Sequence, residues 1–511
     1  MPRSAINLEP YKAEIVALYT KNISCDSIIE NLSRTHNITI SERTLRARLR
    51  GWGIQKQNRT VGTNQVLHAR IKVLFYHIGL EERELLEVLQ RDGFDITART
   101  LLYLRHKLGL YRRIKNPIVD QTQVENVLEQ LRAELNHSKV EGFGETLLHT
   151  FYQSKGHLLA RDCLYSSYRK AAPAAERRCL QDLQQERGAY VVPGPNYIWS
   201  MDGYLKLAPY GIEIYAAIDA YSRYIIWIYV GNTSRTAVSV LRQFLEAVHV
   251  IKRQPQIVRS GQGTGTILLA EAQHKLQQSR HPEAQLSGCY IYGTSTAHQR
   301  IEAWWDQLTK GLLYRWSTYF QSLQEEGTYS KDNVADQIAL YAVYMRVLRL
   351  EITSFVRTWN NHPIHLQKNR PHLVSGKPFM NFNYPKDGVL NYGLEFDENL
   401  LSSMHEDVRN WDPEEYLPSA TYDWTKAQLK ELNFDLVDPP KHAEGVGFAP
   451  YYTTYLELRA RISAHISQGN EPELGLPSPP IGKLNGEPTL IHNISEVEIL
   501  YDQDAPEDGV E

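Results

Sequence analysis

Residues 195–316 contain an order of strand-like and helix-like segments that restricts the possible folds. Three runs rich in β-branched and aromatic residues come first and are joined by short turns into a meander, PNYIWSMDGYLKLAPYG, IEIYAAIDAYS and RYIIWIYVGN. A helical run follows, then a short strand at QIVRS, a second helical run through LLAEAQHKLQQ and another strand at CYIYG. A long helix is expected to begin at about Ala297.

Three antiparallel strands followed by helices that alternate with short strands are the order of an RNase H-like α/β domain. We assign residues 191–316 to a core of this class. Asp202 lies in the first strand among apolar residues, where a carboxylate is costly unless it binds a metal or accepts hydrogen bonds. Glu302 lies on the late helix, in AHQRIEAWW. These two residues are the candidate catalytic residues.

Five segments of the chain resemble the integrase core of retroelements and of DNA transposons whose transposase is similar to retroviral integrase. They occur in the same order over about residues 190–380: GPNYIWSMDGY, IDAYSRYIIWIYVGNTS, VRSGQGTG, YGTSTAHQRIEAWWDQL and FVRTWNNHPI. The resemblance implies a DDE polynucleotidyl transferase, in which two aspartates and a glutamate hold two Mg²⁺ or Mn²⁺ ions for DNA cleavage and strand transfer. Carboxylate oxygens are the ligands that these hard cations prefer.

The resemblance assigns the first aspartate to Asp202 and the glutamate to Glu302, but the second aspartate is missing. The family has a segment resembling R-S-D-x-G-T-E after a short strand, and RSGQGTG places Gly261 at the ligand position. The 40 residues between Gly261 and Glu302 are a spacing that the family accepts. We therefore expect metal binding to be weak or lost and catalysis to be impaired. Asp219 and Glu271 are the alternative carboxylates, although neither occupies the family position.

The N-terminal region is an internal duplication. Residues 14–56 overlay residues 70–112 after a shift of 56 positions, so that Arg43-Thr44-Leu45 falls on Arg99-Thr100-Leu101. In each copy two amphipathic stretches precede a third, which is expected to begin after an N-cap at Ser41 or Thr97. Three short helices per copy form a helix-turn-helix layout. The copies also resemble helix-turn-helix segments that precede the cores of transposon-derived fungal proteins.

The third predicted helix of each copy is basic, and we expect it to contact phosphates and base edges of DNA. The candidate DNA-binding residues are Arg43, Arg46, Arg48 and Arg50 in the first copy, Arg99, Arg105, Lys107, Arg112 and Arg113 in the second, and Arg300 in the core. Arg300 matches the family's N-Q-R-I-E pattern. The alternative is a helical bundle whose basic face is only solvated.

Net charge changes along the chain. It is +9 over residues 1–119, the duplicated helix-turn-helix region, and +5 over residues 120–384. The latter comprise a helical linker (120–190), the core (191–316) and its C-terminal helical part (317–384). Residues 385–511, read as an irregular and partly disordered acidic extension, carry −17, with short helices expected at TKAQLKELN and TYLELRARISAHIS. A basic first segment suits a polyanion, whereas the acidic end repels one.

Composition restricts the protein class further. The chain is 42% hydrophobic and 23% charged, as is typical of a globular protein, and no apolar run is long enough to cross a membrane. Four widely spaced cysteines fit a reducing compartment, so we expect the nucleus or the cytosol. The expected partner is DNA, with a possible homo-oligomer, no membrane and no small-molecule substrate. Two functions remain open: an impaired strand-transfer enzyme, or a DNA-binding or regulatory protein that keeps the core as a scaffold. A third, nuclease action on RNA, would need the same missing carboxylate.

Overall fold

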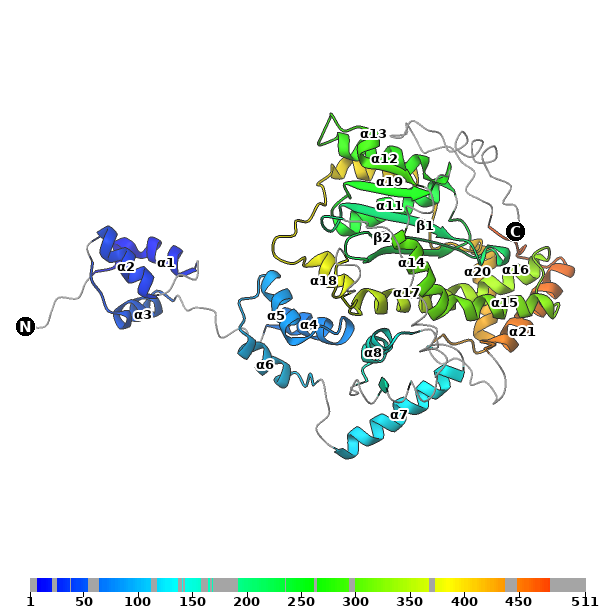
Figure 1. The fold of residues 1–511 in the computed structure, drawn as a ribbon, viewed down its shortest axis with the longest axis horizontal. Coiled ribbons are helices and arrows are strands. Elements are labelled where there is room, and N and C mark those ends of the chain that lie inside the picture. Colours follow the sequence, from blue (N-terminus) through cyan, green and yellow to red (C-terminus); the bar gives the residue numbers. More distant parts are fainter. Residues whose placement is uncertain are drawn as a thin grey trace, which may run out of the picture. The chain divides into compact units, whose positions relative to one another are not determined.

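The structure is a computed structural model with two compact units, Met1–Tyr111 and Arg112–Glu511. Each unit is described by itself (Figure 1). The described residues are 7–20, 25–36, 38–53, 64–111, 117–136, 140, 143–157, 164–165, 168, 192–234, 236–261, 264–293, 299–366, 373–436 and 448–477.

The N-terminal unit contains three α-helices in each copy of the repeat. The first copy has η1 (Glu9–Tyr11), α1 (Lys12–Thr20), α2 (Cys25–His36) and α3 (Glu42–Gly51), and the second has α4 (Gln65–Lys72), the π-helical turn η2 (Val73–His77), α5 (Glu82–Arg91) and α6 (Ala98–Lys107). The predicted N-caps are confirmed, because Ser41 Oγ accepts a hydrogen bond from the Thr44 amide and Thr97 Oγ1 accepts one from the Thr100 amide, each at 3.2 Å. The shift of 56 residues thus places the start of α3 on the start of α6.

The first copy has an apolar core of its own. Its members come from all three helices and from the segments before α1 and α3: Leu8, Ile15, Ile28, Leu32, Ile40, Leu45 and Leu49. Leu45 and Leu49 are four residues apart, so they lie on the same face of α3 and leave its arginines on the other sides. Burial of this apolar face therefore decides which side of α3 remains exposed.

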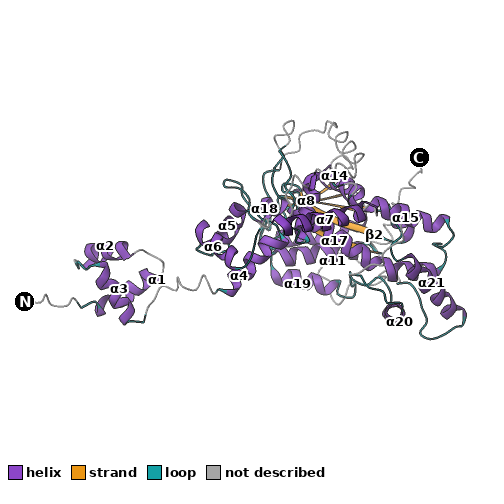
Figure 2. Ribbon diagram, turned by 90° about the horizontal axis from the view of Figure 1, so that it is seen from below, coloured by secondary structure: helices purple, strands orange, loops and turns teal. Residues whose placement is uncertain are grey.

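The second unit is built on a five-stranded mixed sheet. Its strands are β1 (Ile198–Tyr204), β2 (Glu213–Asp219), β3 (Ile225–Gly231), β4 (Ile257–Gly261) and β5 (Tyr290–Gly293), in the order β3-β2-β1-β4-β5. The first three strands are antiparallel, and β4 runs parallel to both β1 and β5. This arrangement confirms the predicted α/β class. In Figure 2 helices lie around the orange strands.

The sheet is covered on both faces, and alternation along the strands sends successive side chains to opposite faces. Trp199 and Met201 pack with α11 (Ala237–Ile251), α12 (Ile267–Gln278) and α19 (Glu398–Asp407), whereas Ile214 and Ala216 pack with α14 (Gln299–Leu308) and α17 (Arg346–Asn361) (Figure 1). We call the latter the α14 face. Because strand β1 alternates in the same way, Asp202 lies on the α14 face.

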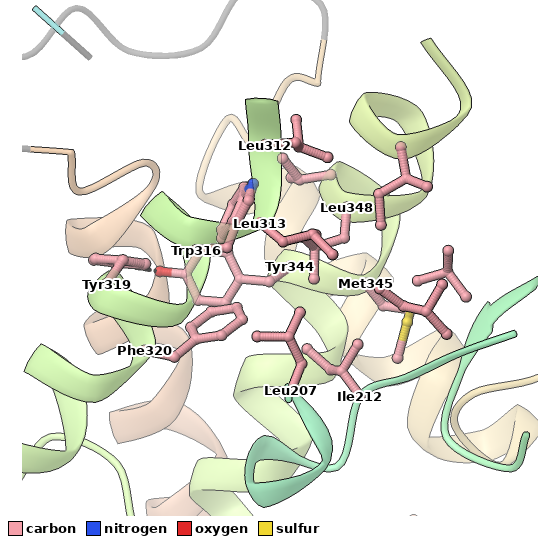
Figure 3. Close-up of a cluster of buried hydrophobic side chains, with 14 of the residues drawn as sticks. Leu207, Ile212, Leu312, Leu313, Trp316, Tyr319, Phe320, Tyr344, Met345 and Leu348 are labelled. Atoms are coloured by element: carbon pink, nitrogen blue, oxygen red, sulfur yellow. Dashed lines mark hydrogen bonds between the residues drawn. The ribbon is translucent and has the colours of Figure 1, made fainter. Parts of the chain in front are cut away.

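The helices on the α14 face are long and nearly continuous. Helix α14 runs through the π-helical turn η7 (Thr309–Leu313) into α15 (Tyr314–Glu325), and α16 (Val334–Leu340) runs through η8 (Tyr341–Met345) into α17. Figure 3 shows Trp316 and Phe320 of α15 packed beside Tyr344 of η8, all of them fully buried. The hydroxyl oxygens of Tyr319 and Tyr344 are hydrogen-bonded at 2.6 Å. The two long helices therefore share one aromatic core.

The linker and the acidic extension contribute to this core as well. The linker holds α7 (Pro117–Asn136) and α8 (Glu145–Ser154), and Leu148 of α8 is fully buried in the core. The short α18 (Pro378–Asn383) precedes the extension. The described part of the extension contains α19, α20 (Ser419–Glu431) and α21 (Tyr452–Ser467). Helices α20 and α21 lie where TKAQLKELN and TYLELRARISAHIS predict short helices, and Tyr455, Leu458 and Ile462 of α21 recur at helical spacing and are fully buried.

A buried ion pair fixes α21 on α16. Asp336 of α16 is buried, and Arg459 of α21 donates two hydrogen bonds to its carboxylate, at 2.5 and 3.2 Å. A bidentate contact between a guanidinium and a carboxylate is strongly directional. It therefore sets the position of α21 as well as its attachment.

The end of α17 is attached to the edge strand β3. The Asn360 side chain accepts a hydrogen bond from the Ile225 amide at 2.8 Å and donates one to the Ile225 carbonyl at 3.1 Å. Trp359 Nε1 donates to the Arg223 carbonyl at 2.9 Å in the preceding turn, and Arg349 Nε donates to the Val230 carbonyl at 2.8 Å near the other end of β3. The Trp-Asn-Asn-His segment therefore seats α17 on the sheet.

His362 ends this segment, and we predict that it makes the core sensitive to acid. Burial lowers its pKa to about 4, and its Nδ1 lies 2.6 Å from the Trp359 carbonyl oxygen. Because the folded protein keeps His362 neutral, its contribution to stability is full above about pH 6.5 and is lost as pH falls toward about 4. The loss should be about 3 kcal/mol in the free energy of unfolding between pH 6.5 and pH 4, measured by urea titration followed by tryptophan fluorescence.

The His362→Gln variant should flatten this acid limb. His281→Gln is the matched control, because it makes the same substitution at an exposed histidine outside this segment. An equal acid loss in wild type and His362→Gln would contradict the prediction.

Candidate functional site

Asp202 and Gly261 are brought side by side by the pairing of β1 with β4. The parallel register joins Ile198 to Ile257 and Ser200 to Arg259. Continuing this register by two residues sets Gly261, the last residue of β4, beside Asp202. Paired residues of parallel strands point to the same face, so a side chain at position 261 would project toward the α14 face next to the Asp202 carboxylate.

Position 261 has room for a side chain. A Cβ atom added to Gly261 would meet no heavy atom within 4 Å, and Gly261 does not have the positive φ that favours glycine. Neither steric contact nor backbone conformation therefore requires glycine here. The glycine instead removes a functional group from a position that could carry one.

Helix α14 brings the second candidate carboxylate to the same face of the sheet. Trp305 Nε1 donates a hydrogen bond to Asp202 Oδ2 at 3.2 Å, which docks α14 on β1 at this point. Glu302 precedes Trp305 by three residues and thus lies one turn away on the same side of the helix. No role was predicted for Trp305 from the sequence, although Trp305 belongs to the tryptophan pair that follows Glu302 in AHQRIEAWW.

The remaining carboxylates do not complete a two-metal site. Among the described residues, no group of three or more His, Cys, Asp or Glu side chains is placed to hold a metal ion. Two divalent cations a few Å apart need shared anionic oxygens, and this site supplies the carboxylates of Asp202 and Glu302 without one at position 261. The residues present therefore do not fit the pair of metal ions that the resemblance implies.

Asp219 does not substitute for the missing aspartate, because its carboxylate is used in a turn. It is fully buried and accepts hydrogen bonds from the Ser222 amide at 2.7 Å, the Ser222 hydroxyl at 2.6 Å and the Asn196 amide at 2.7 Å. Burial raises the pKa of Asp219 to about 6, and the hydrogen bonds from Ser222 oppose that rise. Arg223 donates its hydrogen bond to the Val374 carbonyl at 2.6 Å and not to Asp219. The observed role of the Asp219 carboxylate is therefore to cap the turn.

Glu271 is also directed away from the site. It lies on α12, which packs on the face of the sheet opposite to Asp202. Its carboxylate forms an ion pair with Lys275 one turn later, at 2.9 Å. Neither alternative carboxylate therefore reaches the position that Gly261 leaves open.

The first copy of the repeat carries its arginines on an exposed helix. Arg43, Arg46, Arg48 and Arg50 of α3 are all exposed. Arg46 donates to Glu42 at 2.9 Å from Nε, and this hydrogen bond raises the pKa of its guanidinium. Four cations on about two turns of one helix form a surface that favours an anionic partner.

In the second copy Arg105 must be removed from the set of expected DNA-contacting residues. It is only 8% exposed, forms an ion pair with Glu82, donates to the Leu110 carbonyl at 3.2 Å and lies 4.8 Å from the Phe75 ring centroid. It occupies the repeat position of Leu49, which is also buried. Arg105 is therefore a core residue. Arg99 and Lys107 are exposed, and Arg112 and Arg113 lie outside the described residues.

Two family models match the chain. One is described as an integrase core domain and matches residues 189–375. Residues 189–375 form an integrase-like core. The other is described as a Clr5 domain and matches residues 4–56, the first copy of the repeat. No curated protein matches the chain.

Solved structures give one further comparison. A chain in a cryo-EM structure of the simian T-cell lymphotropic virus intasome in complex with PP2A regulatory subunit B56 gamma is 13% identical to this chain, with a TM-score of 0.25. The match covers 42% of this chain and 63% of that chain. This chain therefore spans less than two thirds of the length of the chain it matches. Within the described residues, no helix is long and apolar enough to cross a membrane.

A second cation, Arg300, lies close enough to Arg223 to affect its pKa. The pKa of Arg223 is lowered to about 10, mainly by burial and partly by the charge of Arg300. Arg300 lies on α14 two residues before Glu302. The structure thus places Arg300 at the same end of α14 as the candidate carboxylate, on the side of the sheet that holds Asp202.

We predict that Arg105 contributes to folding of the second copy. Arg105→Ala should remove its contacts with Glu82, Leu110 and Phe75 and destabilise that copy by roughly 1–3 kcal/mol. Hydrogen exchange of the full chain should then show faster exchange of the α5 and α6 amides. Arg105→Leu is the matched control, because leucine fills the equivalent core position in the first copy and should retain most of the protection. Unchanged exchange in Arg105→Ala would contradict a core role.

Proposed function

We propose that this integrase-like protein binds DNA through its basic N-terminal unit, and that its integrase core domain is impaired in the metal-dependent cleavage and strand transfer of its family. The observation that carries the proposal is the position of Gly261 beside Asp202, where the family has its second metal-ligating aspartate. The proposed location is the nucleus, where a DNA partner is present.

Impaired catalysis follows from the negative charge that the site lacks. Divalent ions supply several kcal/mol of transition-state stabilisation in reactions of this class, and they require anionic ligands to stay in place. Here Asp202 accepts a hydrogen bond from Trp305, and position 261 adds no charge. The site therefore holds fewer negative charges than two divalent ions need, while the fold around it is retained.

DNA binding is inferred from the arginines of α3. They are exposed, they share one short helix, and the region of residues 1–119 has a net charge of +9. Proteins that neutralise DNA phosphates release counterions, so such binding weakens as salt concentration rises. A basic helix face that is only solvated, and does not bind DNA, would show no such salt dependence.

The first test measures how duplex binding by the full chain depends on salt. The Arg46→Ala/Arg50→Ala variant should bind more weakly, with the slope of log affinity against log salt reduced by about 2. Arg34→Ala is the matched control, because Arg34 on α2 forms the same kind of exposed i,i+4 pair, with Glu30 at 2.6 Å, as Arg46 forms with Glu42. Wild-type binding that does not change with salt would refute the proposal.

The second test restores the missing carboxylate. Gly261→Asp should fold, because the position has room, and should raise the affinity for Mn²⁺ and Mg²⁺ measured by calorimetry. If the rest of the site is intact, it should also nick duplex DNA in a metal-dependent way. Gly288→Asp in α13 (Leu286–Cys289) is the matched control, since it adds the same charge at another glycine with no neighbour within 4 Å.

The outcomes separate the open functions. Nicking by Gly261→Asp that is lost in Gly261→Asp/Asp202→Asn would support an enzyme impaired at one residue. Metal binding without nicking would favour the DNA-binding or regulatory scaffold. Nicking by the wild-type protein that Asp202→Asn abolishes would show that the site is not impaired.

A further inference from the structure

The two copies of the repeat differ on the exposed side of their third helices. The shift of 56 residues places Leu102 on Arg46 and Tyr103 on Ala47. Leu102 is 47% exposed and Tyr103 is 62% exposed. Since α6 buries Leu101 and Leu104 in its own core, these two side chains are not needed to hold the helix in place. Adjacent exposed apolar side chains of this kind form a patch that a partner can cover.

Cations flank the exposed tyrosine on the same side of α6. Arg99, Tyr103 and Lys107 follow one another at intervals of four residues, which aligns them along one helix face, and all three are exposed. His106 lies beside this line and contacts Tyr111, with ring centroids 5.5 Å apart, and Tyr111 is 45% exposed. We call Arg99, Leu102, Tyr103, His106, Lys107 and Tyr111 the aromatic face of the second copy.

The charge around the aromatic face favours an anionic partner. Helix α6 has the sequence ARTLLYLRHK and contains no acidic residue. Glu82, from the neighbouring helix α5, is already engaged by the buried Arg105. The aromatic face therefore combines two exposed rings with exposed cations at a helix spacing that a nucleic-acid backbone can follow.

We propose that the aromatic face binds single-stranded nucleic acid, with bases stacked on Tyr103 and Tyr111 and the backbone phosphates contacted by Arg99 and Lys107. This inference extends the proposed DNA binding of the N-terminal unit and rests on it. In a duplex the flat faces of the bases are hidden in the stack, so an exposed tyrosine ring gains a stacking partner only from an unpaired base. The arginines of the first copy, in contrast, suit the phosphates of a duplex. The two copies thus divide the recognition of paired and unpaired strands.

The test compares two probes on the full-length chain: an oligothymidine of about 20 nucleotides and a mixed-sequence duplex of the same length, followed by fluorescence anisotropy. Tyr103→Ala should weaken binding of the single strand roughly 5- to 150-fold, because loss of one stacked base costs that much. It should change duplex binding by less than about 2-fold, within the usual effect of an exposed substitution.

Two control variants keep the test specific to stacking. Tyr103→Phe keeps the ring and should bind the single strand as wild type does. Val66→Ala removes a more exposed apolar side chain from α4, outside the aromatic face, and should have no effect on either probe. In the reverse direction, Ala47→Tyr places a ring on the equivalent position of the first copy and should strengthen single-strand binding.

The remaining outcomes overturn the inference or the proposed function separately. Wild-type protein that binds the duplex but not the single strand would refute the inference and leave duplex binding intact. Single-strand binding without duplex binding would support the inference and refute the duplex proposal. Equal losses on both probes in Tyr103→Ala would show that Tyr103 contacts the duplex. If Tyr103→Ala changed the oligomeric state measured by light scattering but left the single-strand affinity unchanged, the aromatic face would bind a second copy of the chain. That result would refute the inference.

Discussion

The parallel pairing of β1 with β4 is the contact on which the candidate site depends. It sets β1 in the middle of the sheet, with antiparallel β2 on one side and β4 on the other, so that Asp202 has neighbours from strands far apart in sequence. The same register makes position 261 the strand neighbour of Asp202. Helix α14 then closes over this point through the hydrogen bond from Trp305 to Asp202. A site of this kind needs no loop to assemble it, since its positions follow from one register and one helix contact.

The described packing does not depend on a side chain at position 261. Glycine at position 261 touches no neighbour that a side chain would displace, and the packing of Trp304 and Trp305 is complete without it. A carboxylate at this position would be repelled by Asp202 in the absence of metal, so its loss relieves a local cost. On the proposed function, stability and catalysis place opposite demands on position 261, and glycine meets the demand of stability.

The order of elements in the core and the two N-caps could be predicted from sequence, because β-rich runs, turns and Ser or Thr before an amphipathic stretch are local signals. The burial of Arg105 could not be read from its charge, although the repeat offered a signal, since Leu49 stands at the equivalent position. In residues 385–477 the segments TKAQLKELN and TYLELRARISAHIS predict α20 and α21, whereas no helix was predicted at α19. Trp305 was missed because its role depends on how α14 docks on β1, which no local pattern encodes.

Helix α17 has a consequence for assembly. Strand β3 is an edge of the sheet, and an edge strand presents unpaired amide and carbonyl groups to which another strand can add. Here Asn360 occupies both backbone groups of Ile225, and Arg349 occupies the carbonyl of Val230. A polypeptide that approached β3 would have to displace both side chains before it could form a ladder. Two side chains of one helix thus obstruct strand addition near both ends of β3.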